Sequence, residues 1–266
     1  MQIQGKVAII TGGARGFGKR LAELIVDKGG KVVLGDILEE EGAKTASELN
    51  NRGHGPRVAV FQKCDVRALD DIARLVSAAQ AEFGCLDIMV NNAGIGGTLL
   101  WADPDTSSLS RIIDINLRAP VEGTRLAVKY FMDNRRAGCV VNVASMMAFF
   151  PMEFDPVYGA TKSGVVNLTA SCATLALMDP PIHVNVVAPN YADTAMVQGM
   201  AEGGASSLLK KNGVLTVDEV VDQMIRCIED ESLSGDCIKL LPDRPPLVHK
   251  GRKAVSTGIV TQAAKL

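Results

Sequence analysis

The chain has 266 residues, 47% of them hydrophobic, which is enough for a large core and excludes a disordered chain. Its net charge of −2, with acidic and basic residues mixed along the chain, excludes the basic surface of a nucleic-acid-binding protein. The six cysteines form no C-x-x-C pair and the three histidines are scattered, which predicts free thiols in a reducing, cytoplasmic compartment and no metal site.

Short apolar runs alternate with longer amphipathic segments along the first half of the chain. The N-terminus enters an apolar run directly, so we expect no signal peptide, and no run approaches the ~18 residues of a membrane-spanning helix. The apolar runs predict strands at 6–11, 31–36, 58–64 and 86–91. The amphipathic segments predict helices at 16–28, from the second strand to about residue 50, and at 69–83, with a turn at 51–56.

The same alternation continues in the second half, with helices expected at 106–134, 156–178 and 217–229 and strands at 138–144, 182–187 and 237–241. Apolar strands that alternate with helices are typical of a parallel sheet buried on both faces. We therefore expect an α/β fold: a single Rossmann-type doubly wound parallel sheet with helices on both faces. One domain would cover residues 1–266, with a substrate lid at about 189–215 and a tail at about 242–266.

A glycine-rich turn joins the first predicted strand to the first predicted helix. Gly12, Gly16 and Gly18 let the backbone turn tightly and approach a pyrophosphate, where the helix N-terminus supplies free N–H groups. An ordinary turn would need only one or two glycines. Asp36, at the end of the second strand, can accept hydrogen bonds from the ribose hydroxyls and would repel the 2′-phosphate of NADP. We therefore predict NAD as the cofactor, while Arg15 in the same turn keeps an NADPH-dependent carbonyl reductase open as the alternative.

Tyr158 and Lys162 are four residues apart on a predicted helix, so they share one face. An isolated pair of this kind is usually a surface pair, but the glycine turn upstream favours a catalytic role. A tyrosine ordinarily has a pKa of about 10, and lowering it to about 7 requires roughly 4 kcal/mol of interaction with positive charge. We predict that Tyr158 is the general base or acid and that Lys162, helped by the positive charge of an oxidised nicotinamide, lowers its pKa.

Together these motifs resemble the short-chain dehydrogenase/reductase family. The resemblance rests on T-G-x-x-x-G-x-G at 11–18, N-N-A-G at 91–94 and Tyr158-x-x-x-Lys162, in the family's order, and it covers residues 5–241. It implies an NAD- or NADP-dependent oxidoreductase. It also implies a homo-oligomer, a dimer or tetramer, formed through the helix that carries Tyr158 and the long helix before it.

The resemblance assigns roles to further residues. Ser145, thirteen residues before Tyr158, would orient the reacting oxygen. Asn116 would hold a water linked to Lys162, although from the residues alone a local role at a helix bend is an equal alternative. Asp65 matches the position that contacts the adenine. The cofactor-binding residues that it implies beyond Gly12, Gly16, Gly18 and Asp36 are Arg15, Phe17, Asp65, Val66, Asn92, Ala93, Gly94, Tyr158, Lys162, Pro189 and Thr194. The family usually has Pro-Gly where this chain has Pro189-Asn190.

Apolar side chains gather just after Ser145, where an adaptable wall suits a hydrophobic alcohol, although ordinary core packing explains them equally well. Within the family, the chain most resembles NAD-dependent enzymes that oxidise a secondary alcohol of a lipid. The expected substrate contacts are Ser145, Met147, Asp155 and Tyr158, and Asp155 replaces a glutamine of those enzymes. We expect a hydrophobic secondary alcohol or its ketone as the substrate. A catalytically silent dinucleotide-binding protein is the alternative from another class.

Overall fold

An eight-stranded sheet runs through the computed structural model, which describes residues 1–52, 57–97, 100–101, 106–151, 153–200, 209–210 and 212–251. The strand order is β3-β2-β1-β4-β5-β6-β7-β8, and every neighbouring pair is parallel except β7 and β8. The strands are β1 (Val7–Thr11), β2 (Lys31–Asp36), β3 (Ala59–Lys63), β4 (Ile88–Asn91), β5 (Gly138–Val143), β6 (Ile182–Pro189), β7 (Cys237–Leu240) and β8 (Leu247–His249).

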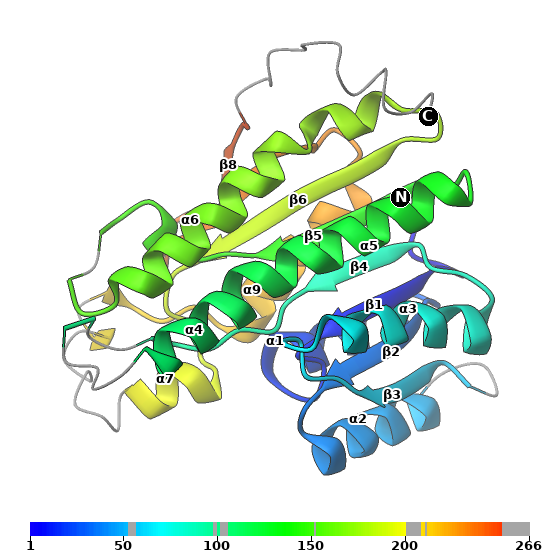
Figure 1. The fold of residues 1–266 in the computed structure, drawn as a ribbon, viewed down its shortest axis with the longest axis horizontal. Coiled ribbons are helices and arrows are strands. Elements are labelled where there is room, and N and C mark those ends of the chain that lie inside the picture. The colour runs from blue at the N-terminus through cyan, green and yellow to red at the C-terminus, as the bar shows by residue number, and fades with distance from the viewer. Residues whose placement is uncertain are drawn as a thin grey trace.

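Helices cover both faces of this sheet (Figure 1). One layer contains α1 (Gly16–Asp27), α2 (Glu39–Arg52) and α9 (Val217–Glu229). The other contains α3 (Leu69–Phe83), α5 (Ala119–Asp133) and α6 (Pro156–Ser171), and Figure 1 shows α5 and α6 in front of the sheet. The arrangement confirms the predicted Rossmann-type α/β fold.

The apolar strands separate two hydrophobic clusters, as β1 illustrates. Ala8 and Ile10 belong to the cluster under α1, α2 and α9, whereas Val7 and Ile9 belong to the cluster under α3 and α5. Successive side chains of a strand point to opposite faces, so a strand with helices on both sides must be apolar throughout. This is why β1 is apolar without alternation.

Several boundaries differ from the sequence-based expectation. The long helix expected at 106–134 is interrupted: α4 (Ser107–Ile113) and α5 are joined by a π-helical turn at Asp114–Arg118. The helix expected at 156–178 ends at Ser171 and continues as a 3₁₀ turn at Ala173–Leu177, where the Ser234 hydroxyl donates to the Ala173 carbonyl. This tertiary hydrogen bond satisfies a carbonyl within the 3₁₀ turn.

Two elements were not expected from the sequence. A short helix, α7 (Ala195–Met200), lies in the segment expected to be an irregular lid, and β8 extends the sheet within the expected tail. The rest of the lid and tail is described only in part, because 201–208, 211 and 252–266 lie outside the described residues.

The order of the strands determines where a ligand can bind. The chain passes outward from β1 to β2 and β3, and then returns to place β4 on the other side of β1. In open parallel sheets, ligands bind at such a reversal, beyond the carboxyl ends of the strands. The ends of β1 and β4 carry the glycine turn and Asn91–Gly94, which are therefore neighbours at this point.

Candidate active site

The glycine turn after β1 is tight on one side and open on the other. Gly12 (φ +65°) and Gly16 (φ +55°) have left-handed backbone conformations that side chains disfavour. A Cβ on Gly18 would lie 2.1 Å from the carbonyl oxygen of Gly12, so only glycine fits there. A Cβ on Gly16, in contrast, would meet only Thr194 Cγ2, at 3.9 Å. The turn therefore leaves space between Gly16 and Thr194.

The N-terminus of α1 suits an anion. Its N-cap residue, Arg15, makes no side-chain capping bond, and the first turn has no acidic residue. Both α2 and α9 carry acidic residues in their first turns, which complement the helix dipole. Arg15 is exposed and has no ion pair among the residues the structure describes, while Phe17 packs against the core. The uncapped helix end and the glycine turn fit a dinucleotide pyrophosphate.

Asp36 is attached to the glycine turn through its carboxylate. Its Oδ2 accepts from the Ala14 N–H at 3.0 Å, and its Oδ1 accepts from the Leu38 N–H at 3.1 Å. A carboxylate offers about four acceptor positions, so each oxygen retains one. Asp36 can therefore hold the turn and still accept from two ribose hydroxyls.

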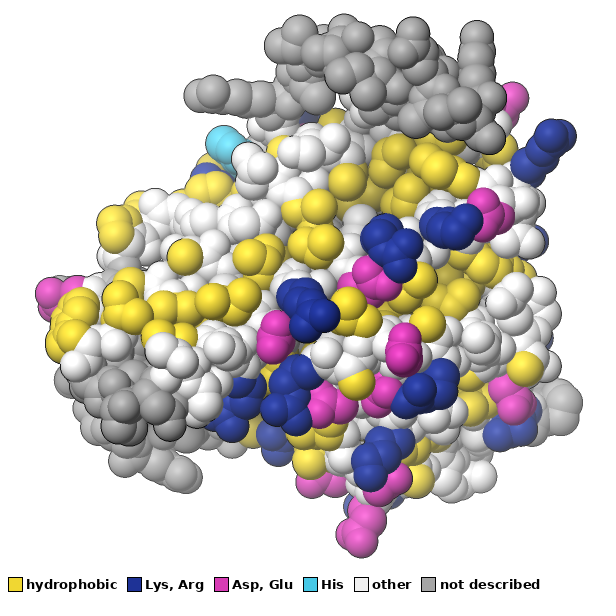
Figure 2. Space-filling view, in the orientation of Figure 1, with side chains coloured by type: hydrophobic (Ala, Val, Ile, Leu, Met, Phe, Trp, Pro, Cys, Tyr) yellow, Lys and Arg dark blue, Asp and Glu magenta, His cyan; other side chains and the backbone are white. Residues whose placement is uncertain are grey.

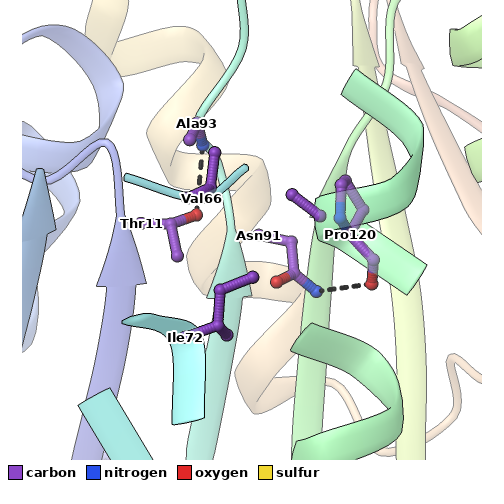
Figure 3. Close-up of a pocket in the computed structure, with 7 residues that line it drawn as sticks. Thr11, Val66, Ile72, Asn91, Ala93 and Pro120 are labelled. Carbon is purple, nitrogen blue, oxygen red and sulfur yellow. Dashed lines mark hydrogen bonds between the residues drawn. The ribbon is translucent and has the colours of Figure 1, made fainter. Parts of the chain in front are cut away.

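The segment after β4 is hydrogen-bonded to the glycine turn. Asn92 Nδ2 donates to the carbonyl oxygens of Thr11 (2.9 Å) and Gly12 (3.0 Å). Thr11 Oγ1 accepts from the N–H groups of Asn92 (3.1 Å) and Ala93 (3.2 Å), the latter shown in Figure 3. The sequence placed Thr11 in the motif without showing that its hydroxyl joins the two strand ends.

Val66 and Asp65 lie beside this junction. Val66 lines a small pocket with Thr11 and Ala93 that is too narrow to hold a ligand (Figure 3). Asp65 pairs with Arg67, with Oδ2 and Nη2 2.5 Å apart, and this hydrogen bond lowers the pKa of Asp65. The structure thus places both residues at the junction, and an adenine contact for Asp65 stays a prediction.

Ser145, Tyr158 and Lys162 come together beyond the end of β5. Lys162 Nζ lies 5.5 Å from the ring centroid of Tyr158 and donates to the Val143 carbonyl at 2.9 Å. Ser145 Oγ accepts from the Met147 N–H at 3.2 Å, and a hydrogen bond with Ser145 acts to lower the pKa of Tyr158. A half-buried phenol with a buried hydroxyl and a buried amine in this arrangement can exchange a proton with a bound alcohol.

Burial dominates the titration of both groups. It raises the pKa of Tyr158 to about 12 and lowers the pKa of Lys162 to about 8. Both shifts favour the uncharged forms. For Tyr158, desolvation by the protein outweighs the hydrogen bond with Ser145, which is the one contact of the described residues that acts to lower its pKa.

Asn116 is fully buried on the π-helical turn. Its Oδ1 accepts from the Ile95 N–H at 2.9 Å and its Nδ2 donates to the Ile95 carbonyl at 2.8 Å. A Cβ on Gly94 would lie 3.3 Å from Asn116 Oδ1 and 3.5 Å from Lys162 Nζ, so these groups surround Gly94 closely. The side chain thus pairs with a distant backbone segment and not with its own helix, and π-helical turns are frequent at functional sites.

Asp155 is the N-cap of α6 and is buried. Its Oδ1 accepts from the Tyr158 N–H at 3.2 Å, and its Oδ2 accepts from the Gly97 N–H at 2.8 Å. Burial raises the pKa of this carboxyl. Asp155 therefore joins the start of α6 to the segment after Gly94, and a substrate contact for it stays a prediction.

The apolar side chains after Ser145 do not all face the catalytic groups. Met147, Phe149 and Phe150 line an open hollow of about 340 Å³ beside the first turns of α6. Neither Ser145 nor Tyr158 lines this hollow. These three side chains of the expected apolar wall thus line a hollow to which the catalytic groups do not contribute.

At the end of β6, Pro189 is buried and Thr194 faces the glycine turn. Asn190, which stands at the family's usual glycine, donates its N–H to the Leu240 carbonyl at 2.9 Å. Its φ is not positive, since the described non-glycine residues with positive φ are Arg135 and Asp243. The departure from Pro-Gly is therefore accommodated without strain.

A buried amide network beneath the site was missed at the sequence level. Asn91 Nδ2 donates to Asn142 Oδ1 (2.8 Å) and lies 3.4 Å from the Pro120 carbonyl (Figure 3), while Asn142 Nδ2 donates to Thr169 Oγ1 (3.0 Å). The network attaches α5 and α6 to the sheet. Asn142 in the otherwise apolar run Gly138–Val143 was the available signal, because a buried amide needs partners.

Over the described ranges, no group of three His, Cys, Asp or Glu side chains is arranged to hold a metal ion, and all six cysteines are free. In the part of the chain that the structure describes, no helix has both the length and the apolar character needed to cross a membrane.

Comparison with known proteins gives consistent matches. The family model described as short chain dehydrogenase matches residues 6–204. The NAD(+)-dependent 15-hydroxyprostaglandin dehydrogenase of Bos taurus is 30% identical over 254 residues, 90% of this chain and 92% of that enzyme. The cis-4-hydroxycyclohexanecarboxylate dehydrogenase of Sinomonas cyclohexanicum is 34% identical, with 86% and 91% covered. A crystal structure of a short-chain dehydrogenase/reductase from Mycobacterium marinum superposes with a TM-score of 0.81 at 25% identity, covering 90% of this chain and 95% of that one.

Proposed function

We propose that this chain, which belongs to the short-chain dehydrogenase family, transfers a hydride between NAD and a hydrophobic secondary alcohol or its ketone. The observation that carries the proposal is the grouping of Ser145, Tyr158 and Lys162 near Gly94, in the segment that is hydrogen-bonded to the glycine turn. A silent dinucleotide-binding protein would have no need to bury a lysine against a tyrosine at this position.

The residues that would hold the cofactor surround the ends of β1 and β4. The α1 N-terminus and the glycine turn would hold the pyrophosphate, Asp36 the adenosine ribose, and Thr194 the nicotinamide end. Asp36 supports NAD over NADP, because a 2′-phosphate would meet a carboxylate whose oxygens already hold two backbone N–H groups in place. Arg15 supports the NADPH-dependent reductase as the second candidate, because it is exposed in the same turn.

Proton transfer is the task of the chain's own residues. When bound, oxidised NAD supplies the hydride acceptor and a positive charge. Ser145 Oγ would donate to the substrate oxygen and orient it. Tyr158 Oη would take the hydroxyl proton in oxidation and return it in reduction. Lys162, in its protonated form, would stabilise the phenolate, which burial alone disfavours.

The names of the relatives support a secondary alcohol. The bovine relative is named for a hydroxyl on a prostaglandin, and the Sinomonas relative for a hydroxyl on a cyclohexane ring. Both are secondary alcohols on largely apolar frameworks. The free cysteines favour a reducing compartment such as the cytoplasm.

Side-by-side fluorescence titration with NADH and NADPH tests the cofactor assignment. We expect wild-type protein to bind NADH at least about tenfold more tightly, and Asp36→Asn to lose most of this preference because the charge is removed while the shape is kept. Arg15→Ala should keep the preference for NADH. Tyr158→Phe should bind NADH normally and lose roughly 10²–10⁴-fold in turnover.

Tighter binding of NADPH by the wild-type protein would instead favour the reductase. Binding of neither cofactor would favour the silent protein and contradict the proposal.

A further inference from the structure

The side chain of Tyr191, just beyond β6, is buried but has an unpaired hydroxyl. Its relative exposure is 7%, and its Oη has no hydrogen-bond partner among the residues the structure describes. Buried tyrosine hydroxyls usually find a partner, because a buried unpaired polar group costs stability. The unpaired Tyr191 hydroxyl therefore lowers the stability of the fold, and no contact of the described residues offsets this loss.

The side chain of Tyr191 is buried, but it belongs to none of the three hydrophobic clusters formed by the described residues, unlike that of its neighbour Ala192. Its backbone is firmly held, since its carbonyl accepts from the Leu215 N–H at 2.8 Å. A rigidly placed phenol with an unpaired hydroxyl is suited to contact a ligand.

The position of Tyr191 is next to the catalytic groups. β5 and β6 are parallel neighbours with Val143 opposite Val187, so Ser145 and Tyr191 both lie just beyond the carboxyl ends of adjacent strands. Tyr191 also contributes to raising the pKa of Tyr158, which places the two phenols within electrostatic range of each other.

We propose that the Tyr191 hydroxyl hydrogen-bonds a second oxygen of the substrate, so that the enzyme selects secondary alcohols that carry a further polar oxygen near the reacting carbon. The proposal rests on the dehydrogenase function proposed above and narrows its substrate class. A site with a buried hydrogen-bonding group discriminates against an analogue that lacks the partner, because the group is then left unpaired.

The first test compares two buried tyrosines. Tyr130 Oη accepts from the Leu86 N–H at 3.2 Å, so Tyr130→Phe leaves a buried donor unpaired and should lower the urea midpoint of unfolding. Tyr191→Phe removes a hydroxyl that has no partner, so its midpoint should stay unchanged or rise. A fall equal to that of Tyr130→Phe would mean that the Tyr191 hydroxyl is structural and would overturn the proposal.

The second test measures kcat/KM with NAD for cyclohexanol and for the 1,2-, 1,3- and 1,4-cyclohexanediols, which differ only in a second hydroxyl. We expect wild-type protein to prefer at least one diol by about tenfold, which is the worth of one hydrogen bond. Tyr191→Phe should lose that preference and leave cyclohexanol within about twofold.

The outcomes separate this proposal from the function it rests on. If wild-type protein oxidises cyclohexanol and all the diols with the same kcat/KM, the role of Tyr191 is overturned but the dehydrogenase function is not. The same holds if Tyr191→Phe lowers kcat/KM equally for every alcohol and raises the KM for NAD. Failure to oxidise any of these or a wider set of secondary alcohols, with NAD or NADP, would contradict the dehydrogenase function and the substrate class with it.

Discussion

Lys162 shows how a single buried charge relates chemistry to stability. It is 4% exposed, and burial lowers its pKa from 10.5 to about 8. Because the folded pKa is below the unfolded one, the unfolded chain binds more protons between about pH 8 and 10.5, and stability rises with pH across that window. At pH 7 the buried ammonium costs about 3 kcal/mol, at 1.36 kcal/mol for each pKa unit.

We expect Lys162→Met to increase the free energy of unfolding at pH 7 by about 1 kcal/mol, after subtracting the lost hydrogen bond to the Val143 carbonyl. This advantage over wild type should shrink as the pH is raised from 8 to 10.5, since wild type then loses the proton that burial disfavours. Urea denaturation at pH 7 and pH 10 measures both quantities. If Lys162→Met is less stable than wild type at pH 7, or if its gain in stability does not change with pH, then burial of the Lys162 ammonium does not destabilise the fold.

On the scale of the element, the N-cap of α6 connects this helix to the active site. Asp155 caps this helix and also holds the Gly97 N–H, whereas Thr216 caps α9 in a reciprocal capping box with Glu219 and, among the described residues, holds no further segment. Both Asp155→Ala and Thr216→Ala should lower the free energy of unfolding by about 1 kcal/mol, with a larger loss for Asp155 because the Gly97 N–H is also left unpaired. Thermal or urea unfolding measures this.

Only the cap of α6 should affect turnover. Asp155→Ala is expected to lower kcat/KM, because it removes the carboxylate that accepts hydrogen bonds from both the segment after Gly94 and the backbone of Tyr158. Thr216→Ala is the matched control and should leave kcat/KM within about twofold. Equal effects of the two substitutions on activity would mean that Asp155 acts only through global stability.

On the scale of the whole molecule, the outer face of α6 is suited to pack against a second copy. Its exposed positions Ala160, Ser163, Asn167 and Ser171 recur every three or four residues, and none is charged. Figure 2 shows uncharged side chains over α6, whereas the charges on neighbouring α5 form pairs such as Arg125–Glu122 and Lys129–Asp133. We propose that the chain is one domain and forms a homodimer or tetramer through this face.

Light scattering should therefore give two or four times the mass of the chain. Asn167→Glu places like charges opposite each other if two α6 helices cross, so it should shift the protein toward the monomer. Asn51→Glu, at an exposed position on α2, adds the same charge elsewhere and should leave the mass unchanged. A monomeric wild-type protein would refute the proposed assembly.

The sequence by itself determined the layers of this molecule and the family to which it belongs. Strands such as Val7–Thr11 are apolar throughout because both of their faces are buried, and that requirement is visible residue by residue. Gly12 and Gly16 could likewise be interpreted locally, because the left-handed turn that they form needs no distant partner.

Only the tertiary structure decided what depends on distant partners. The bond from Ser234 to the Ala173 carbonyl joins residues 61 positions apart, and the pairing of Asn116 with Ile95 joins residues 21 positions apart. The short strand β8 is stabilised by its pairing with β7. Its three residues are too few to show the pattern of hydrophobic residues from which a strand can be predicted. The depth at which Tyr158 is buried, which raises its pKa when only protein groups are present, is likewise a property of the assembled fold.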